Sequence, residues 1–224
     1  MAKVIVRNVS KSYEKHVLGP CSFTVEEGNT LLVMGPSGSG KSTLLKACAG
    51  LLEVEGEILL EDSKRVCVVF DESKCLNHLS VQDNISLGMK KEGYSEEEIR
   101  QRVYNVAERV HLSEHLLKRP DECSLGQRQR IALARALVRD FDILLMDEPF
   151  TGLDILLRRQ MLSWLKQMQK EKGFTCMMVT HDHRDAKILS DQVLILNEGH
   201  VEMLDTYEQC LNHPVNEFVG AFLK

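Results

Sequence analysis

Residues 35–43 read Gly35-Pro36-Ser37-Gly38-Ser39-Gly40-Lys41-Ser42-Thr43. This stretch fills every fixed position of the phosphate-binding pattern G-x-x-x-x-G-K-S/T. The apolar run at 30–34 comes just before it and predicts a buried strand, whereas the apolar residues within 44–49 predict a helix that ends at Gly50. Because the motif requires a strand, a glycine-rich loop and a helix in this order, the sequence predicts a nucleoside triphosphate site.

Each part of this loop has a chemical role in holding a triphosphate. Its glycines let the backbone bend so that successive N–H groups point at phosphate oxygens, and the helix N-terminus adds a partial positive charge. Lys41 is expected to reach the β- and γ-phosphates, and the Ser42 hydroxyl is expected to bind Mg²⁺. The alternative, a chance Gly/Ser loop, is disfavoured because all fixed positions are filled and both flanks match.

The composition is that of an ordinary globular protein. The chain has 224 residues, of which 43% are hydrophobic and 27% charged, and its formal net charge is −5. This negative charge argues against nucleic acid as a partner. No apolar run is long enough to span a bilayer and the first residues lack a signal-peptide core, so we expect any membrane role to depend on a partner protein.

The seven cysteines are odd in number and form no C-x-x-C pair. This usage is typical of a reducing cytosol, in which most cysteines act as small core residues, so we expect a cytoplasmic protein. A zinc site is the less favoured alternative, because the cysteine spacing does not match one.

The rest of the chain divides into β-rich and helical parts. Apolar runs predict strands at residues 3–9, 21–26, 57–61, 66–70, 143–146, 175–180, 193–197 and 199–204. Helices are predicted at residues 80–89, 95–110, 124–138 and 154–172, and two short helices are expected to close the chain. Since no strand is predicted between 71 and 139, this segment is expected to be an inserted helical subdomain.

A second group of candidate site residues follows the predicted strand at 143–146, which ends in Asp147-Glu148-Pro149. The Asp147 carboxylate is suited to hold the Mg²⁺ that Ser42 also binds. Glu148 comes one residue later, where the strand ends, so its carboxylate can approach the γ-phosphate from another direction and deprotonate the attacking water. An apolar strand that ends by chance in Asp-Glu is the weaker interpretation beside an intact phosphate loop.

A further helix start, Ser124-Leu125-Gly126-Gln127, offers a second set of first-turn N–H groups for an anion. On its own it would be interpreted as a helix cap. Together with the other motifs it gives the chain a resemblance to the ATPase subunit of an ABC transporter. The residues that carry this resemblance, in this order and spacing, are Tyr13, Gly35–Thr43, Ser124–Gln127, Asp147–Pro149, Gly152–Asp154 and His181–Asp182.

The resemblance implies a role for each of these motifs. Tyr13 matches the aromatic residue that stacks on adenine, and His181 matches the switch histidine that contacts the γ-phosphate. Ser124–Gln127 matches the signature loop, which contacts the ATP held by a partner subunit, and Asp154 matches the loop that crosses the dimer interface. Such a composite site explains why one chain carries two phosphate-binding helix ends. Without the resemblance, His181 would be interpreted as an ordinary histidine at a strand end.

Two positions depart from the family pattern. Asp71 stands where the family usually has a glutamine that binds Mg²⁺, so it keeps an acceptor oxygen but lacks the amide donors and adds negative charge. We expect Asp71 to bind Mg²⁺ together with Ser42 and Asp147. Leu125 replaces the first glycine of the usual Leu-Ser-Gly-Gly-Gln, whereas Gly126 is kept. Both departures are expected to affect the hydrolysis rate more than nucleotide binding.

The predicted protein is an α/β P-loop NTPase with a RecA-like core, an antiparallel β subdomain and a helical subdomain at about 71–139, within one ATPase domain at 1–224. The resemblance implies that it binds ATP and Mg²⁺ and pairs head to tail with a second ATPase subunit, identical or paralogous. It also implies docking on transmembrane permease subunits at the inner face of the cell membrane. The tail at 212–223 resembles the end of the ATPase domain in importers, which implies solute import with a solute-binding protein. Importer subunits often carry a further C-terminal regulatory domain, and this chain is expected to stop before it.

Two other functions remain as alternatives. A non-transport ABC ATPase that acts on another macromolecule would carry two ATPase domains or a long coiled coil, and the sequence predicts neither. A P-loop kinase would leave Ser124–Gln127 and His181 unexplained.

Overall fold

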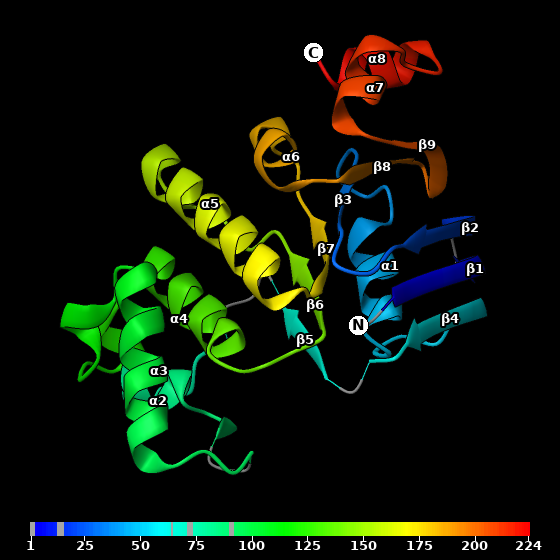
Figure 1. Cartoon of the computed structure of the whole chain (residues 1–224). Coiled ribbons are helices and arrows are strands. Elements are labelled where there is room, and N and C mark those ends of the chain that lie inside the picture. The colour runs from blue at the N-terminus through cyan, green and yellow to red at the C-terminus, as the bar shows by residue number, and fades with distance from the viewer. Residues whose placement is uncertain (1–2, 13–15, 64, 71–73, 90–91) are drawn as a thin grey trace. The chain divides into compact units, whose positions relative to one another are not determined.

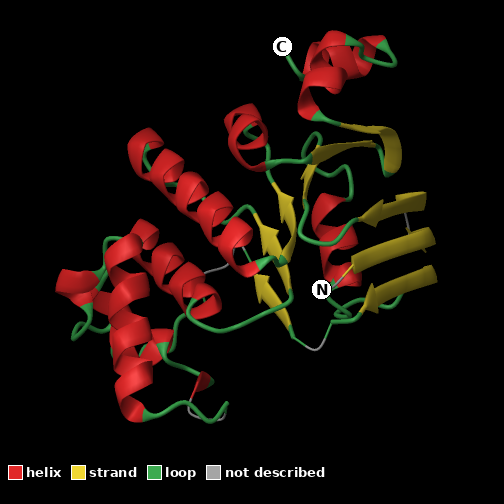
Figure 2. Ribbon diagram, viewed as in Figure 1, coloured by secondary structure: helices red, strands yellow, loops and turns green. Residues whose placement is uncertain are grey.

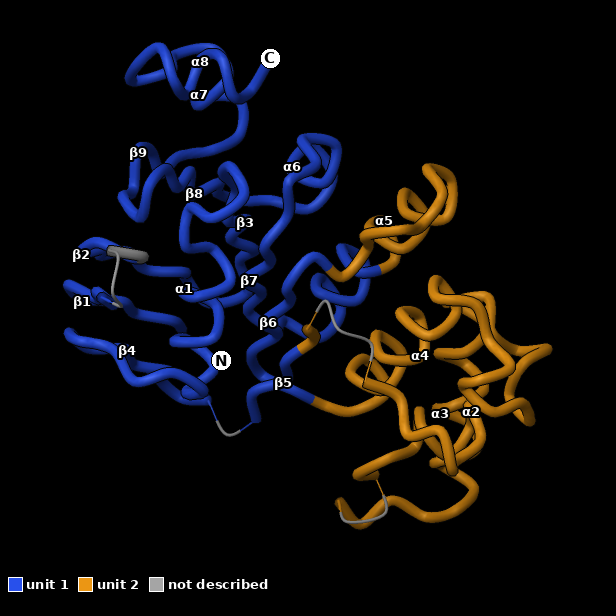
Figure 3. The backbone as a smooth tube through the Cα atoms, turned by 180° about the vertical axis from the view of Figure 1, so that it is seen from behind, with its two compact units in different colours: residues 1–68, 141–148, 165–224 blue, residues 69–140, 149–164 orange. Residues whose placement is uncertain are grey.

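The computed structural model describes residues 3–12, 16–63, 65–70, 74–89 and 92–224. Two predicted site residues, Tyr13 and Asp71, lie outside these ranges. The chain combines helices and strands, as expected for an α/β protein (Figures 1 and 2). The backbone contacts divide the chain into two compact units (Figure 3). The first unit comprises residues 1–68, 141–148 and 165–224, and the second comprises residues 69–140 and 149–164.

A six-stranded sheet runs through the first unit. Its strands, in spatial order, are β5 (Val66–Val69), β6 (Ile143–Asp147), β7 (Thr175–Val179), β3 (Thr30–Met34), β8 (Gln192–Asn197) and β9 (His200–Asp205). β3 pairs in parallel with β7 and β8, β6 pairs in parallel with β7, and β9 is antiparallel to β8. Every residue of β3, β6 and β7 is buried, which explains why these strands are continuous apolar runs in the sequence.

A second sheet in the first unit is antiparallel. Its central strand β1 (Lys3–Ser12) lies between β2 (His16–Val25) and β4 (Glu55–Glu61). Along β1, the buried residues Val4 and Val6 alternate with less buried neighbours, as in a strand with one face in the core. This sheet is the antiparallel β part that the sequence predicts.

Helix α1 (Lys41–Cys48) follows β3 through the phosphate loop and contacts strands of both sheets. Leu44, Leu45 and Cys48 of this helix join one cluster of buried side chains with residues of β1, β2, β3, β6, β7 and β8. Burial raises the pKa of the Cys48 thiol to about 12, so this cysteine stays protonated and packs as a small apolar residue. All seven cysteines lie within the described ranges, and none of them forms a disulfide bond there.

Helices α7 (Tyr207–Asn212) and α8 (Glu217–Phe222) confirm the prediction of two short helices at the end of the chain. Helix α6 (His183–Leu189) is not predicted by the sequence pattern, because a helix of 7 residues gives too few turns to show a period. Asp182 caps α6 by accepting a hydrogen bond from the Arg184 N–H group. Among the described residues, no helix has the length and apolar character needed to cross a membrane.

The second unit is helical. It contains α2 (Val81–Ile85), α3 (Glu96–Arg109), α4 (Leu125–Leu137), two short 3₁₀ turns η2 (Ser113–His115) and η3 (Pro120–Glu122), and the first part of α5 (Ile155–Lys172). α4 packs against α2 and α3. Ser95 and Glu98 form the capping box that the sequence predicts for α3. The helix predicted at 80–89 is shorter in the structure and spans Val81–Ile85. It could not extend to residue 89, because Gly88 adopts a φ of 95°, which a right-handed helix cannot accommodate.

Candidate functional site

The phosphate loop joins β3 to α1 and turns sharply at its glycines. Gly35, Gly38 and Gly40 have φ angles of 149°, 79° and 99°, in the region that favours glycine. Gly40 is the N-cap residue of α1. Gly35 also lies against β8, because a Cβ atom built on it would come within 2.0 Å of the Leu196 carbonyl oxygen. The loop therefore follows a path that requires glycine at 35.

The close approach of Gly35 to β8 predicts that a side chain at this position destabilises the fold. Gly35→Ala should destabilise the fold by about 3 kcal/mol or more, because the new methyl group meets backbone atoms that cannot move aside. Gly38→Ala is the matched control, since it has a similarly unfavourable φ of 79° but no heavy atom within 4 Å of the added Cβ. It should cost only about 1–2 kcal/mol. Urea unfolding of both variants measures the difference, and equal losses would contradict the close approach at Gly35.

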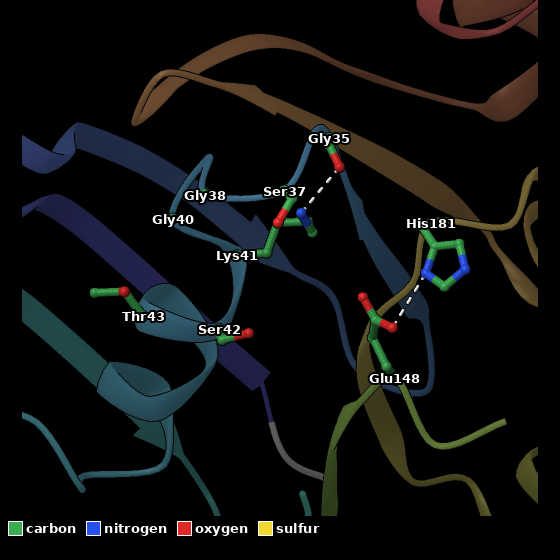
Figure 4. A pocket seen from close by; sticks show the side chains of 9 residues that line it. All are labelled: Gly35, Ser37, Gly38, Gly40, Lys41, Ser42, Thr43, Glu148 and His181. Carbon is green, nitrogen blue, oxygen red and sulfur yellow. Dashed lines mark hydrogen bonds and ion pairs between the residues drawn. The ribbon is translucent and has the colours of Figure 1, made fainter. Parts of the chain in front are cut away.

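The loop forms one wall of a pocket of about 310 Å³ in the first unit (Figure 4). The pocket is lined by Gly35, Ser37, Gly38, Gly40, Lys41, Ser42, Thr43, Glu148 and His181. All nine are residues that the sequence predicts for the site. The other two loop residues shape the turn, because the Ser39 N–H group donates to the Pro36 carbonyl oxygen at 3.2 Å. Glu148 and His181 come to the pocket because β6 and β7 are parallel neighbours, so the residues that follow them emerge at the same sheet edge.

Lys41 is buried, with 7% of its surface exposed. Its Nζ atom donates to the carbonyl oxygens of Gly35 at 2.9 Å and of Pro36 at 2.6 Å. Burial lowers the pKa of Lys41, and the nearby carboxylates of Glu148 and Asp147 partly oppose this effect. Both hydrogen-bond acceptors are neutral, so a charged phosphate oxygen in the pocket would be a stronger partner for this ammonium group.

Asp147 and Ser42 place two oxygen atoms together beside the loop. Asp147 is the last residue of β6 and is buried, with 7% of its surface exposed. The Ser42 hydroxyl, in the first turn of α1, donates to Asp147 Oδ1 at 3.1 Å. The structure thus brings together two of the three residues that the sequence predicts as Mg²⁺ ligands, and the third, Asp71, lies outside the described residues.

Glu148 stands just beyond β6 in a left-handed conformation, with a φ of 45°. For a residue with a side chain this conformation costs about 1–2 kcal/mol, and such strain is typical of functional positions. A backbone hydrogen bond of 3.0 Å from the Glu148 N–H group to the Val179 carbonyl oxygen holds the turn. The turn directs the carboxylate towards His181, whose Nδ1 atom lies 3.1 Å from Glu148 Oε2 (Figure 4). The sequence does not predict this contact or the strained turn.

The signature loop lies in the second unit, at the start of α4. Ser124 is the N-cap residue, its hydroxyl accepts from the Gln127 N–H group at 3.2 Å, and Gln127 Oε1 accepts from the Ser124 N–H group at 2.8 Å. Leu125 is 63% exposed. Gly126, the glycine that the sequence retains, lies near Gly152, because a Cβ atom built on it would come 3.8 Å from the Gly152 carbonyl oxygen.

Asp154, also in the second unit, uses its side chain within its own turn. Its Oδ1 atom accepts a hydrogen bond of 2.9 Å from the Leu157 N–H group in the first turn of α5. The Arg130 guanidinium on α4 interacts electrostatically with Asp154, although burial lowers the pKa of Arg130. Asp154 and Ser124–Gln127 therefore belong to one unit, and the phosphate loop, Asp147, Glu148 and His181 belong to the other.

Comparisons with known proteins agree with these motifs. A family model described as "ABC transporter" matches residues 18–151, more than half of the chain. This range includes the phosphate loop, Ser124–Gln127 and Asp147-Glu148.

Among curated proteins, the sn-glycerol-3-phosphate import ATP-binding protein UgpC of Jannaschia sp. is 38% identical over all of this chain and 67% of its own length. The maltose/maltodextrin import ATP-binding protein MalK of Photorhabdus laumondii is 38% identical over all of this chain and 63% of its own length. The chain thus spans about two thirds of the length of the curated relatives it matches.

Among solved structures, the ATP-binding cassette MJ0796, a dimer in a post-hydrolysis state bound to ADP and Pi, superposes with a TM-score of 0.84 and 29% identity. The superposition covers 91% of this chain and 98% of that one. The likeness therefore extends from the local motifs to nearly the whole fold. The chain belongs to the ABC transporter family of ATP-binding proteins.

Proposed function

We propose that this chain binds and hydrolyses ATP as the subunit that powers solute import through a membrane permease. The observation that carries the proposal is the pocket of the first unit, where the phosphate loop faces Glu148 and His181. Asp147, hydrogen-bonded to Ser42, lies beside the same loop. An anion-binding loop, a carboxylate beside it and a second carboxylate for proton transfer are the parts that phosphoryl transfer to water needs. The names of two relatives, import ATP-binding proteins for sn-glycerol-3-phosphate and for maltose/maltodextrin, support import as the process.

The triphosphate of ATP would lie against the loop. The backbone N–H groups of the loop and the N-terminus of α1 favour negative charge there. We infer that Lys41 exchanges its two carbonyl acceptors for phosphate oxygens when ATP binds, because its ammonium group already lies at the loop. Tyr13 is proposed to stack on the adenine, on the sequence pattern alone.

The residues beside the loop fit Mg²⁺. The Ser42 hydroxyl and the Asp147 carboxylate are hard oxygen ligands held 3.1 Å apart. The described residues contain no cluster of three or more His, Cys, Asp and Glu side chains, but Mg²⁺ usually keeps several waters and takes only one or two carboxylates. When bound, the ion would reduce the negative charge of the phosphate oxygens. Asp71 remains a proposed further ligand.

Asp147→Asn tests this assignment. The amide keeps an oxygen that can accept from Ser42 but loses the negative charge that attracts the cation, so Mg²⁺ should bind about 10–100-fold more weakly. Calorimetry should show that the variant loses the gain in ATP affinity that Mg²⁺ gives the wild type. With Mg²⁺ removed by EDTA, the two proteins should bind ATP equally. An unchanged response of the variant to Mg²⁺ would exclude Asp147 from the metal site.

For hydrolysis, we propose Glu148 as the general base that takes a proton from the attacking water. Its carboxylate lines the pocket, and the strained turn at Glu148 holds it at the end of β6. His181, hydrogen-bonded to Glu148, restricts the orientation of this carboxylate. A histidine in this position can also donate to the γ-phosphate through its second ring nitrogen, the role that the resemblance implies.

We further propose that two chains pair head to tail around ATP. The capping box uses the N–H groups of Ser124 and Gln127, whereas the N–H groups of Leu125 and Gly126 have no carbonyl partner within α4, so this first turn can offer them to an anion held by another chain. The similarity to MJ0796, which was solved as a dimer, supports this arrangement. Asp154 would then lie at the interface with the second ATPase chain, either an identical or a paralogous one.

The permease and a solute-binding protein are the remaining proposed partners, which would place this chain at the cytoplasmic face of the membrane. The test is co-expression with a candidate permease, followed by solute uptake into right-side-out vesicles loaded with ATP. We expect uptake that requires ATP and fails with Glu148→Gln. ATP hydrolysis without any coupled uptake, by a chain that purifies with the permease, would contradict the import role.

A further inference from the structure

His115 contacts the signature loop through Gln127. It lies at the end of the 3₁₀ turn η2, and its Nε2 atom is 2.9 Å from Gln127 Nε2. Both residues belong to the second unit, so the contact is internal to one compact body. No sequence motif marks His115, and the proposed function gives it no role.

The chemistry of this contact determines where the proton of His115 lies. Gln127 Oε1 already accepts a hydrogen bond from the Ser124 N–H group at 2.8 Å. The other end of the amide is therefore the NH₂ group, which can only donate. His115 Nε2 must then be the acceptor, so the imidazole is neutral and carries its proton on Nδ1.

The Nδ1–H tautomer of His115 has an unfavourable free energy of burial. His115 Nδ1 is buried and has no hydrogen-bond partner among the described residues. A buried N–H group without a partner is unfavourable, and native structures rarely keep one without a reason. In the other tautomer, His115 Nδ1 would still lack a hydrogen-bond partner. Its Nε2–H group would then face the NH₂ group of Gln127, so that two donors would meet. The role of His115 as the hydrogen-bond acceptor of the Gln127 amide explains why the unpaired Nδ1–H group is kept.

Gln127 in turn holds the first turn of α4. Its side chain bonds to Ser124, and its own N–H group bonds to the Ser124 hydroxyl at 3.2 Å. These bonds fix the backbone of Leu125 and Gly126, the two residues between them. If Gln127 lost His115, its amide could rotate, and the capping box would lose its fixed geometry.

We propose that His115 is a positioning residue for ATP hydrolysis. As the hydrogen-bond acceptor of Gln127, it keeps the signature loop in the conformation that meets the nucleotide of the partner chain. This inference rests on the proposed function of Ser124–Gln127 in a head-to-tail dimer. It predicts that the loss of His115 affects dimer closure and turnover, and leaves the binding of ATP to the phosphate loop of a single chain unchanged.

The test uses three variants. His115→Phe keeps a ring but removes the acceptor, and should lower turnover about three- to tenfold, the effect of one hydrogen bond. His115→Gln offers a carbonyl oxygen at similar reach and should restore at least half of the wild-type rate. His213→Phe, an exposed histidine at the end of α7 in the first unit, makes the same chemical change elsewhere and should have no effect. ATP affinity measured on the single chain should be equal in all of them.

A spectroscopic readout separates positioning from a general loss of stability. Long-range ¹H–¹⁵N spectra of the full chain, with His115 assigned by its absence in His115→Gln, should show the Nδ1–H tautomer. The Nε2–H tautomer would overturn the inference even if His115→Phe did not fold. A turnover of His115→Phe equal to wild type, or a His115→Gln variant as slow as His115→Phe, would also overturn it.

One further comparison distinguishes this inference from the proposed function. In the Glu148→Gln background, ATP should drive dimerisation, and adding His115→Phe should weaken the dimer about three- to tenfold. If Glu148→Gln does not dimerise with ATP, the proposed role of the signature loop fails. If it dimerises and His115→Phe leaves the dimer affinity unchanged, the proposed function stands and the role of His115 fails.

Discussion

Glu148→Gln should lower the ATPase turnover by about 10²–10⁴-fold while ATP still binds. Glutamine has the size and hydrogen-bonding capacity of glutamate, so the pocket should keep its shape and His181 should keep a partner. It cannot accept a proton from water at neutral pH, and the proton-transfer step therefore loses its base. The measurement is steady-state release of phosphate, with ATP affinity determined by calorimetry on the same preparation.

The chain offers a matched control for this variant. Glu198, in the turn between β8 and β9, is exposed and also has a left-handed backbone, with a φ of 47°. Glu198→Gln makes the same substitution in the same backbone conformation but away from the residues that line the pocket. It should leave turnover unchanged. If Glu148→Gln also hydrolysed ATP at the wild-type rate, Glu148 would not be the base.

Lys41→Ala should weaken ATP binding by about 10²-fold or more, because it removes the buried ammonium that offsets the charge of the triphosphate. Lys46→Ala is the control on the same helix, since Lys46 is exposed in the last turn of α1. It should bind ATP as the wild type does. Calorimetric titration of both variants gives the comparison, and an unchanged affinity in Lys41→Ala would mean that the loop does not hold phosphate.

The parts of the site that depend on continuous sequence were predictable. The strand at 30–34, the glycines of the loop and the first turn of α1 follow one another along the chain, so spacing alone predicts a phosphate loop. The capping boxes at Ser95 and Ser124 are likewise local, and the structure confirms the first as predicted and shows the second at the signature loop. The fold class is confirmed as well, because apolar runs of this length and order are typical of buried parallel strands.

Features that depend on tertiary pairing were not predictable. The contact between Glu148 and His181 exists because β6 and β7 are adjacent in the sheet. The order of strands in a sheet cannot be predicted from apolar runs in the sequence. The left-handed turn at Glu148 has no signal in the sequence, because glutamate is not a residue that favours it. His115 reaches Gln127 from a 3₁₀ turn of three residues, too short to show a pattern. The sequence predicts neither its contact nor its protonation.

Leu125, which departs from the family pattern, is the first residue of α4. Leu125 is 63% exposed, as expected for a side chain that leaves the N–H groups of Leu125 and Gly126 at the start of α4 accessible. The effect of Leu125 and of Asp71 on the hydrolysis rate stays a prediction of the sequence. Turnover of Asp71→Gln and of Leu125→Gly, which restore the residues usual in the family, tests this prediction.

We propose that two copies of this site close around ATP and that hydrolysis opens them. Light scattering of the Glu148→Gln chain, eluted from a size-exclusion column with Mg²⁺ and either ATP, ADP or no nucleotide, tests it most directly. We predict the mass of a dimer with ATP, one bound nucleotide per chain, and the mass of a monomer with ADP or without nucleotide. The mass of a monomer at saturating ATP, in a variant that binds ATP and does not hydrolyse it, would contradict the proposed ATP-dependent dimer.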